Sequence, residues 1–548
     1  MSVQVSAGDE AAELVASLAL GPTAQALFIP ELLSLVLSFS NPACLATSAR
    51  VCKGWCDPAL NHLWRDLHSA FPLLELLFDI NLIKDQHDSL FFKKLAHILV
   101  DADWDRFHSY GNRVRSLEFD ETITYRGDPD TPDLDSNIVA VLCLHHPFGA
   151  VFLPYLQELS WTTRGSALSV LPFLSGELRE LHLEMSTQTV STASDLFKAI
   201  RHRTPRLVNF HLETEVQGVS VDTPLARWLR TTENLEEISL PPYYLTPALI
   251  QTLGSLPKLT IIRQSTKFTH AKNSSKAPQY LPTGTFPNLD SISFNATLSE
   301  ARRFLLASQE VVSRLSSIGL HACGRLDTEN ILNFTQHIAQ NCPMMTEIGL
   351  NLFTDLRSRE QSLSPLSMAL LESLYPCAGL EALSIGHPLP FTFQEDDVMQ
   401  IGRAWPQMSF FDVGPDPDFS LPVAGHMGNS FSILSVFAKA LPKLELLSIY
   451  FNKWEPLPFT GNLYLQTQFQ QLTEVRFGLS PAPGGQSRQV GFYIASLCKE
   501  RPAIGYGKTG WHIGALPNDW AQAETAWKEV DDAVGFAMEV KLAGLRSL

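Results

Sequence analysis

Three cysteines near the amino terminus come closest to a metal-binding arrangement. Cys52 and Cys56 are separated by one helical turn, and Cys44 lies nearby. A structural zinc ion takes four Cys or His ligands at suitable spacing, and the neighbouring sequence supplies no second pair. We therefore predict no metal here and expect these thiols to pack as small apolar side chains.

Other reactive side chains also lack catalytic partners. The sequence contains no G-x-S-x-G, H-E-x-x-H, P-loop or C-x-x-C pattern. His145 and His146 precede a proline and have no carboxylate at ligand spacing, while Asp396 and Asp397 stand where a helix begins and acids interact favourably with its dipole. We therefore expect no catalytic residue and no cofactor. An enzyme with a dispersed Cys/His pair is the least favoured alternative.

The composition argues against a nucleic-acid binder and predicts extensive protein contacts. The 41 basic and 57 acidic residues give a net charge of 41 − 57 = −16, whereas a general nucleic-acid binder needs a basic surface. Hydrophobic residues make up 45% of the chain and charged residues only 18%. This is fewer charges than in an average domain, so much of the chain must face other protein.

The sequence also indicates a location. The first residues carry Asp9, Glu10 and Glu13 without a basic region, unlike a secretory signal, and no continuous apolar stretch of about 20 residues occurs. The eight cysteines have no paired spacing and are expected to be reduced and mostly buried. We expect no membrane association and a cytoplasmic or nuclear protein.

Residues 27–67 predict three short helices. Pro30, Pro42 and Pro58 each stand early in a helical pattern, the last two after Asn41 and Asp57. Asn and Asp cap free amides, and the fixed φ of proline suits the first helical turn.

The first of these helices is apolar on two faces. Leu32, Val36 and Phe39 share one face, and Leu33 and Leu37 share another. A helix with two apolar stripes is buried on two sides, which about 40 residues cannot provide alone. Either a partner protein or the rest of this chain must cover the second stripe.

The succession IPELLSLVLSF, P-x-x-L, ARVCKGW and PALxxLWRDL resembles an F-box, in the form common in fungal proteins. The resemblance implies binding to a Skp-family adaptor and, through it, membership of a cullin–RING (SCF) ubiquitin ligase. It covers about 40 residues and departs from the usual pattern in having Ile29 where Leu is common. The residues that it implies for adaptor contact are Ile29, Pro30, Leu33, Leu37, Val51 and Trp55, although each could instead form the core of the unit.

A second pattern, L-x-x-[LIF]-x-[LIF], recurs thirteen times between VRSLEF at residue 114 and LTEVRF at residue 472. Most steps lie near the 20–29 residues of leucine-rich repeats, and amphipathic stretches separate the copies. The copy LTIIRQ at residue 259 is the weakest, because a glutamine occupies its last apolar position. The pattern therefore predicts a short strand followed by a helix in each repeat.

This pattern resembles leucine-rich-repeat proteins and implies an α/β horseshoe, with parallel strands on the concave face and helices on the convex face. The expected domains are a flexible extension (1–26), the F-box (27–67), a helical linker that caps the first repeat (68–110), the solenoid (111–480) and a carboxy-terminal cap (481–548).

In each repeat, the two residues on either side of the first [LIF] position point away from the core. These residues are candidates for substrate binding. The early ones are acidic or polar and favour a basic target segment, with ordinary solvated surface as the alternative. The candidates are Glu158, Glu180, His182, His211, Glu237, Phe410, Asp412 and Arg476.

Together these observations predict a substrate-recognition adaptor of an SCF-type ligase, in which the F-box binds a Skp-family adaptor and the repeats bind an unidentified protein substrate. The alternative is a leucine-rich-repeat scaffold whose F-box does not direct ubiquitylation.

Overall fold

The computed structural model describes residues 29–85, 90–121, 136–146, 151–186, 188–242, 244–265, 280–324, 327–353, 366–419, 421, 427–454, 457, 468–507, 516–517 and 519–546. The expected extension at 1–26 lies outside these residues. The chain divides into two units, 1–236 and 237–548.

The amino-terminal segment forms three helices, as expected: α3 (Pro30–Leu37), α4 (Pro42–Ser48) and α5 (Lys53–Leu63). Pro30 and Pro42 stand in the first turns of their helices, and the Asn41 side chain accepts a hydrogen bond from the Cys44 amide at 2.9 Å. The predicted start of the third helix is wrong, because α5 begins at Lys53 and contains Pro58. A single proline removes one backbone hydrogen bond, which packing of the helix can offset.

The end of this helical segment is itself part of the repeat sheet. Strand β1 (Asp66–Leu67) pairs in parallel with β2 (Ser116–Asp120), with Asp66 opposite Ser116. Between the two strands the chain forms α6 (Phe71–Leu74), η1 (Ile80–Asp85), α7 (Phe91–Val100) and α8 (Trp104–Gly111). The described residues between the two strands are thus mainly helical, and the segment 68–110 leads from one strand of the sheet to the next.

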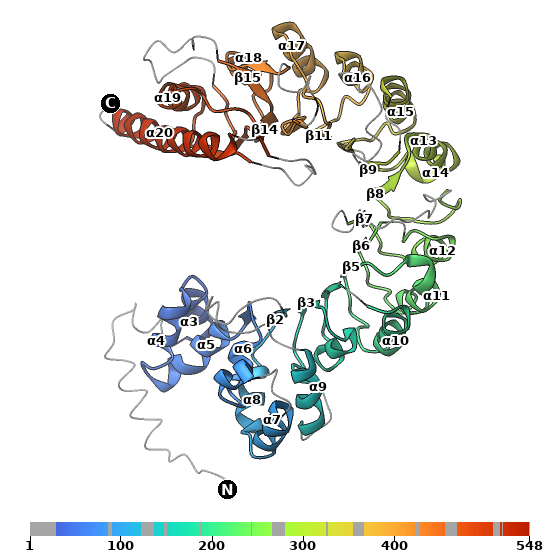
Figure 1. The fold of residues 1–548 in the computed structure, drawn as a ribbon, viewed down its shortest axis with the longest axis vertical. Coiled ribbons are helices and arrows are strands. Elements are labelled where there is room, and N and C mark those ends of the chain that lie inside the picture. The colour runs from blue at the N-terminus through green and yellow to red at the C-terminus, as the bar shows by residue number, and fades with distance from the viewer. Residues whose placement is uncertain are drawn as a thin grey trace. The chain divides into compact units, whose positions relative to one another are not determined.

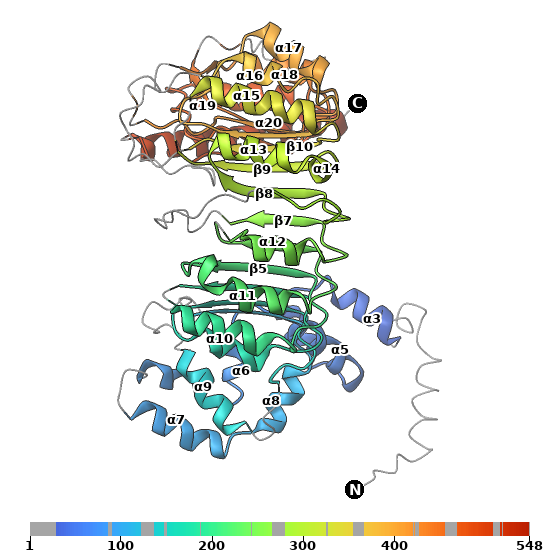
Figure 2. The same cartoon turned by 90° about the vertical axis from the view of Figure 1, so that its right-hand side faces the viewer.

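The first unit continues as a parallel sheet, with β3 (Glu158–Thr163), β4 (Glu180–Met185) and β5 (Asn209–Thr214) paired in sequence order after β2. The intervening segments are α9 (Ser136–His145), η3 (Ala167–Phe173), α10 (Val190–Ile200) and α11 (Gly218–Leu229). Figure 2 shows α10 beside α11, in front of the strands. The Leu positions of the repeat point into the core, where Leu117, Leu159 and Leu181 are at most 2% exposed.

In the second unit, nine strands follow the predicted repeats, from residue 237 to residue 476. Helices α12 to α17 lie on one side of these strands (Figure 1). The strands are β6 (Glu237–Leu240), β7 (Ile261–Gln264), β8 (Ser291–Ala296), β9 (Ser317–Ala322), β10 (Glu347–Asn351), β11 (Ala382–Gly386) and β12 (Phe410–Val413), with β14 (Leu446–Ile449) and β16 (Glu474–Arg476) after them. The helices are α12 (Pro247–Leu253), α13 (Leu298–Ala307), α14 (Gln309–Val312), α15 (Thr328–Asn341), α16 (Met368–Glu372), α17 (Glu395–Ala404) and α18 (Ile433–Ala440).

All thirteen copies of the repeat form strands, including the weak copy, which forms β7. Its broken apolar position, Gln264, is still buried, and its side-chain carbonyl accepts a hydrogen bond from the Asn295 amide. That hydrogen bond satisfies one polar atom of a side chain that burial would otherwise penalise. The small pair β13 (Asn429–Ser430) and β15 (Phe451–Lys453) was not expected from the repeats.

The carboxy-terminal residues cover the last repeat. They form α19 (Ser487–Leu497), β17 (Ala503–Gly505), which pairs with β16, and the long helix α20 (Trp520–Arg546). Trp527 of α20 is fully buried, stacks on Phe477 at 4.3 Å between ring centroids and donates a hydrogen bond to the Ser480 carbonyl. The architecture is therefore the expected one: a short all-α segment followed by parallel α/β repeats of the leucine-rich type.

Candidate protein-interaction surfaces

The core of the amino-terminal helices is small. Leu33 and Leu37 of α3 pack with Leu45 and Ala59, and none of the four is more than 5% exposed. The expectation that Leu33 and Leu37 contact an adaptor is therefore wrong in this structure, because both side chains already fill the space between the three helices. Trp55 is half-buried and packs against the same core.

The opposite face of α3 is apolar and exposed, and we call it the apolar face. One of the expected adaptor contacts, Ile29, stands at the start of this face beside the exposed Pro30, and a second, Val51, is exposed between α4 and α5. The apolar face also contains residues that were absent from the expected contacts, although the periodicity had placed three of them on a second apolar stripe. The exposed fractions are 46% for Ile29, 43% for Leu32, 59% for Leu35, 53% for Val36, 84% for Phe39 and 61% for Val51.

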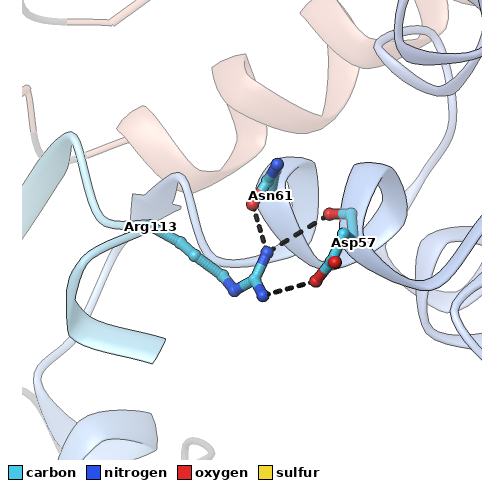
Figure 3. A network of polar contacts seen from close by, with 3 residues as sticks. All are labelled: Asp57, Asn61 and Arg113. Atoms are coloured by element: carbon cyan, nitrogen blue, oxygen red, sulfur yellow. Dashed lines mark hydrogen bonds and ion pairs between the residues drawn. The ribbon is translucent and has the colours of Figure 1, made fainter. Parts of the chain in front are cut away.

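The helices of this segment are tied to the first repeat by a polar network (Figure 3). Arg113, which precedes β2, donates from Nη2 to Oδ1 of Asp57 at 2.7 Å and from Nη1 to Oδ1 of Asn61. The Trp64 ring lies 4.5 Å from that of Tyr110, and the amides of Arg115 and Ser116 both donate to the Arg65 carbonyl. The apolar face therefore belongs to a segment that is hydrogen-bonded to the start of the sheet.

Four of the predicted substrate-binding residues come together on the sheet of the first unit. Glu158 pairs with Glu180, and His182 pairs with His211 in the next row. The two imidazole rings lie 4.2 Å apart in an edge-to-face arrangement, and His211 Nε2 lies 2.9 Å from Glu213 Oε1. Register places further carboxylates on this surface, which we call the acidic face: Glu118, Asp120, Glu184 and Glu213, none of which was predicted. They lie at every second position of their strands, in line with Glu158, Glu180, His182 and His211, so the alternation itself could have identified them.

The other four predicted residues lie in the second unit. Glu237 forms an ion pair with Arg263 at 3.4 Å. Phe410 and Asp412 of β12 share the face of Arg476, whose Nε donates to Glu474 at 2.7 Å. The strands β8 to β11 lie between the pair Glu237–Arg263 and the group around Asp412.

Asp412 is only 3% exposed, so the expectation that it contacts substrate is wrong in this structure. Its Oδ2 accepts a hydrogen bond from Ser384 at 3.3 Å. Burial raises the pKa of this carboxyl group to about 6, although Ser448 and the Arg476 guanidinium act in the opposite direction. The segment after β12 returns close to β16, because the Leu479 amide donates to the Pro415 carbonyl at 3.1 Å.

The sequence had drawn attention to the amino-terminal cysteines and to an acidic pair near residue 396. In the described part of the chain, no three His, Cys, Asp or Glu side chains are grouped to hold a metal ion. Cys44 and Cys52 are exposed and Cys56 is half-buried, and of the eight thiols only Cys342, Cys377 and Cys498 are buried. The expectation that the thiols are mostly buried is therefore wrong. Asp397 accepts a hydrogen bond from the Gln394 amide at 2.8 Å, which caps α17 as expected.

Among the described helices, none has both the length and the apolar character that crossing a bilayer would require.

Comparison with known proteins identifies the amino-terminal segment. Residues 30–70 match the F-box-like family. The solved structures that resemble the chain include the leucine-rich repeat-containing protein LegL7 from Legionella pneumophila, at 12% identity and a TM-score of 0.32, over 54% of this chain and 89% of that one. Curated protein sequences gave no significant match. The F-box-like segment and the repeat fold together support a role as a protein-interaction adaptor.

Proposed function

We propose that the chain is the substrate-recognition subunit of an SCF-type cullin–RING ubiquitin ligase. In this proposal the apolar face of the F-box-like segment binds a Skp-family adaptor, and the repeat sheet binds a protein substrate. The observation that carries the proposal is the exposure of six large apolar side chains within residues 29–51, beside a core that is already complete.

The energetics favour a protein partner for this face. Apolar surface gains about 25 cal/mol for each Å² that is removed from water. Contiguous exposed apolar patches on a soluble protein mark interaction sites, whereas isolated exposed side chains need no explanation. Leu32, Leu35 and Val36 lie within two turns of α3, and Phe39 follows the end of this helix by two residues, so one partner surface could cover all four.

The acidic face is the substrate-binding surface that we favour. Its carboxylates come from four consecutive strands, and two of them, Glu158 and Glu180, are exposed. A dense negative surface steers and orients a basic partner, so the substrate segment should be rich in Lys or Arg. Bound there, a target lysine would be held close to the ubiquitin-loaded conjugating enzyme, and the rate would increase through proximity alone.

The chain itself performs no bond chemistry in this proposal. Burial raises the pKa of Cys342 and Cys498 to about 12, which disfavours a nucleophilic thiolate at either position. The ligase would act in the cytoplasm, the nucleus or both. The alternative is a scaffold that binds the adaptor but directs no ubiquitylation, and reconstitution of the complete ligase with a trapped substrate distinguishes the two.

Co-purification of the full chain with its host's Skp-family adaptor tests the proposal. The double variant Val36→Ser/Phe39→Ser should abolish the complex, as should Ile29→Ala/Pro30→Ala. A matched control is Leu144→Ser/Val219→Ser, which removes apolar side chains that are 81% and 62% exposed elsewhere in the same unit. The control should bind the adaptor like the wild type. If the wild type forms no complex, or if Val36→Ser/Phe39→Ser binds the adaptor as well as the control does, the proposed role of the apolar face is wrong.

The substrate surface has a separate test. Glu158→Lys/Glu180→Lys should weaken capture of the substrate while leaving the adaptor complex intact, because only the acidic face is altered. Substrate capture that is unchanged by this double charge reversal would exclude the acidic face as the binding surface.

A further inference from the structure

A polar cavity lies in the first unit, between the F-box-like helices and the beginning of the sheet. Its volume is about 340 Å³, at the small end of ligand-binding cavities. Ser34 and His62 line it from α3 and α5, Arg65 from the residue before β1, and Arg113 and Arg115 from the segment before β2. Gln157, which precedes β3, also lines it, so the cavity is built from four parts of the chain that are distant in sequence.

The lining carries a concentration of positive charge that is unusual for this chain, which has a net charge of −16. Three of its side chains are guanidinium groups, and the remaining described lining residues are neutral amides, a serine and a histidine. Arginine presents N–H donors in a planar fork that matches phosphate oxygens. An anion entering the cavity would meet several donors and no lining carboxylate.

The three arginines differ in how far they are already engaged. Arg113 is committed to Asp57 and Asn61 (Figure 3), although its Nε atom is buried and has no hydrogen-bond acceptor among the described residues. Arg65 lies 3.8 Å from the exposed carboxylate of its neighbour Asp66. Such a solvent-exposed pair is weak and leaves donors of Arg65 available to a ligand.

Arg115 is held in place without an ion pair to any described carboxylate. Its Nη1 donates to the carbonyls of Asn112 and Val114, at 2.8 and 2.9 Å, and its guanidinium lies 5.2 Å from the centre of the Tyr155 ring. These contacts fix the orientation of the group but leave its charge uncompensated. A preorganised cation of this kind loses little entropy when it binds an anion.

We propose that this cavity binds the phosphate groups of a small, free phosphorylated compound, with Arg65 and Arg115 as the principal ligands and His62 and the neighbouring amides as further hydrogen-bonding groups. The bound compound would connect α5, β1 and β2 and so stabilise the junction between the F-box-like segment and the first repeat. The proposal goes beyond the role in ubiquitylation and does not depend on adaptor binding.

Titration calorimetry of the full chain with pyrophosphate, at low ionic strength, tests the site. We expect a dissociation constant below about 1 mM, and a loss of about tenfold or more in Arg65→Gln and in Arg115→Gln, because each removes charge-assisted hydrogen bonds. The matched control is Arg206→Gln: Arg206 also pairs with an acid, Glu177, and is 59% exposed against 56% for Arg65. This control should bind pyrophosphate like the wild type.

Three results would overturn the proposal. The first is no measurable binding to the wild type, and the second is an equal loss in Arg206→Gln, which would indicate only a general attraction of anions. The third is tighter binding of a phosphoserine peptide than of pyrophosphate, since that would assign the cavity to a protein ligand. Arg65→Lys checks the geometry, because it keeps the charge and should recover only part of the affinity lost in Arg65→Gln. Circular dichroism of every variant verifies that the fold is retained.

Discussion

Arg113 and Asp57 form a charge-assisted hydrogen bond of 2.7 Å that joins the F-box-like helix α5 to the segment preceding β2. The guanidinium is only 18% exposed, whereas the carboxylate is 76% exposed. Together with the β1–β2 pairing, this contact makes the helical segment continuous with the repeat sheet. An adaptor bound to α3 would therefore be held by the same body that presents the acidic face, within the first unit.

Weakening this contact should loosen the junction. We expect Arg113→Ala to reduce local stability by about 1 kcal/mol, because the exposed carboxylate limits the strength of the pair. Hydrogen–deuterium exchange of the α5 and β1 amides measures the change. A double-mutant cycle with Asp57→Asn isolates the pair, and a coupling energy near zero would show that Arg113 acts only through Asn61.

The two stripes of α3 should respond differently to truncation. We expect Leu33→Ala and Leu37→Ala each to destabilise the F-box-like helices by about 2–5 kcal/mol, because each leaves a cavity in a small core. Leu32→Ala should change stability by less than about 0.5 kcal/mol, since its side chain lies on the surface. Local hydrogen exchange of α3 and α5 provides the measurement, and similar costs on both stripes would contradict the assigned core.

Asp412 should reduce stability at neutral pH. Its folded-state pKa of about 6 lies above the ordinary value of 3.8, so the folded state holds more protons between these limits. The stability owed to this group is therefore highest below pH 3.8 and is lost as the pH rises through about 6. Asp412→Asn should stabilise the region around β12 by about 2–3 kcal/mol at pH 7.5 and by much less at pH 4.5.

Hydrogen exchange of β11, β12 and β14 at the two pH values checks the Asp412 prediction. The exposed Asp396→Asn in α17 controls for the loss of one negative charge in the same unit. An equal effect of Asp412→Asn at both pH values would mean that the carboxyl group does not titrate in this window.

His387 should give the opposite pH dependence to that of Asp412, reducing stability at acidic pH. Burial lowers its pKa to about 4, although a hydrogen bond between its Nδ1 atom and the Leu389 backbone acts in the opposite direction. The stability owed to this group is present above pH 6.5 and is lost as the pH falls through about 4. We expect His387→Asn to remove up to about 3 kcal/mol of the acid-induced loss, measured as the difference between pH 7 and pH 4.

The His387 effect is read from exchange at residues 386–391, with the wild type followed in parallel. His321, whose pKa burial also lowers to about 4, contributes in the same direction and remains in the variant. A pH dependence that is identical in the wild type and in His387→Asn would exclude titration of His387.

The carboxy-terminal cap should depend on Trp527. We expect Trp527→Ala to destabilise α19, α20 and β16 by about 3–5 kcal/mol, because a large buried aromatic side chain is lost. Phe536→Ala removes a ring that is 60% exposed on the same helix and should cost little. Thermal unfolding of the two variants gives the comparison, and equal melting temperatures would show that α20 does not stabilise the last repeat.

The sequence by itself determined the repeat architecture. Twelve of the thirteen copies place apolar residues at alternate strand positions, and this period of two is a local property that survives in the folded chain. It also determined that α3 has more apolar surface than three short helices can bury. The predicted contact residue Ile29, at the start of α3, proved to be exposed for this reason.

The tertiary structure alone decided which stripe of α3 faces the core, because Leu33 with Leu37 and Leu32 with Val36 are equivalent in helical periodicity. It also decided that Asp412 is buried. Strand alternation places Asp412 on the face opposite the repeat core, but alternation says nothing about what packs on that face. The pairing of β1 with β2 was likewise beyond the sequence, since a two-residue strand carries no pattern, and its partner lies about 50 residues away along the chain.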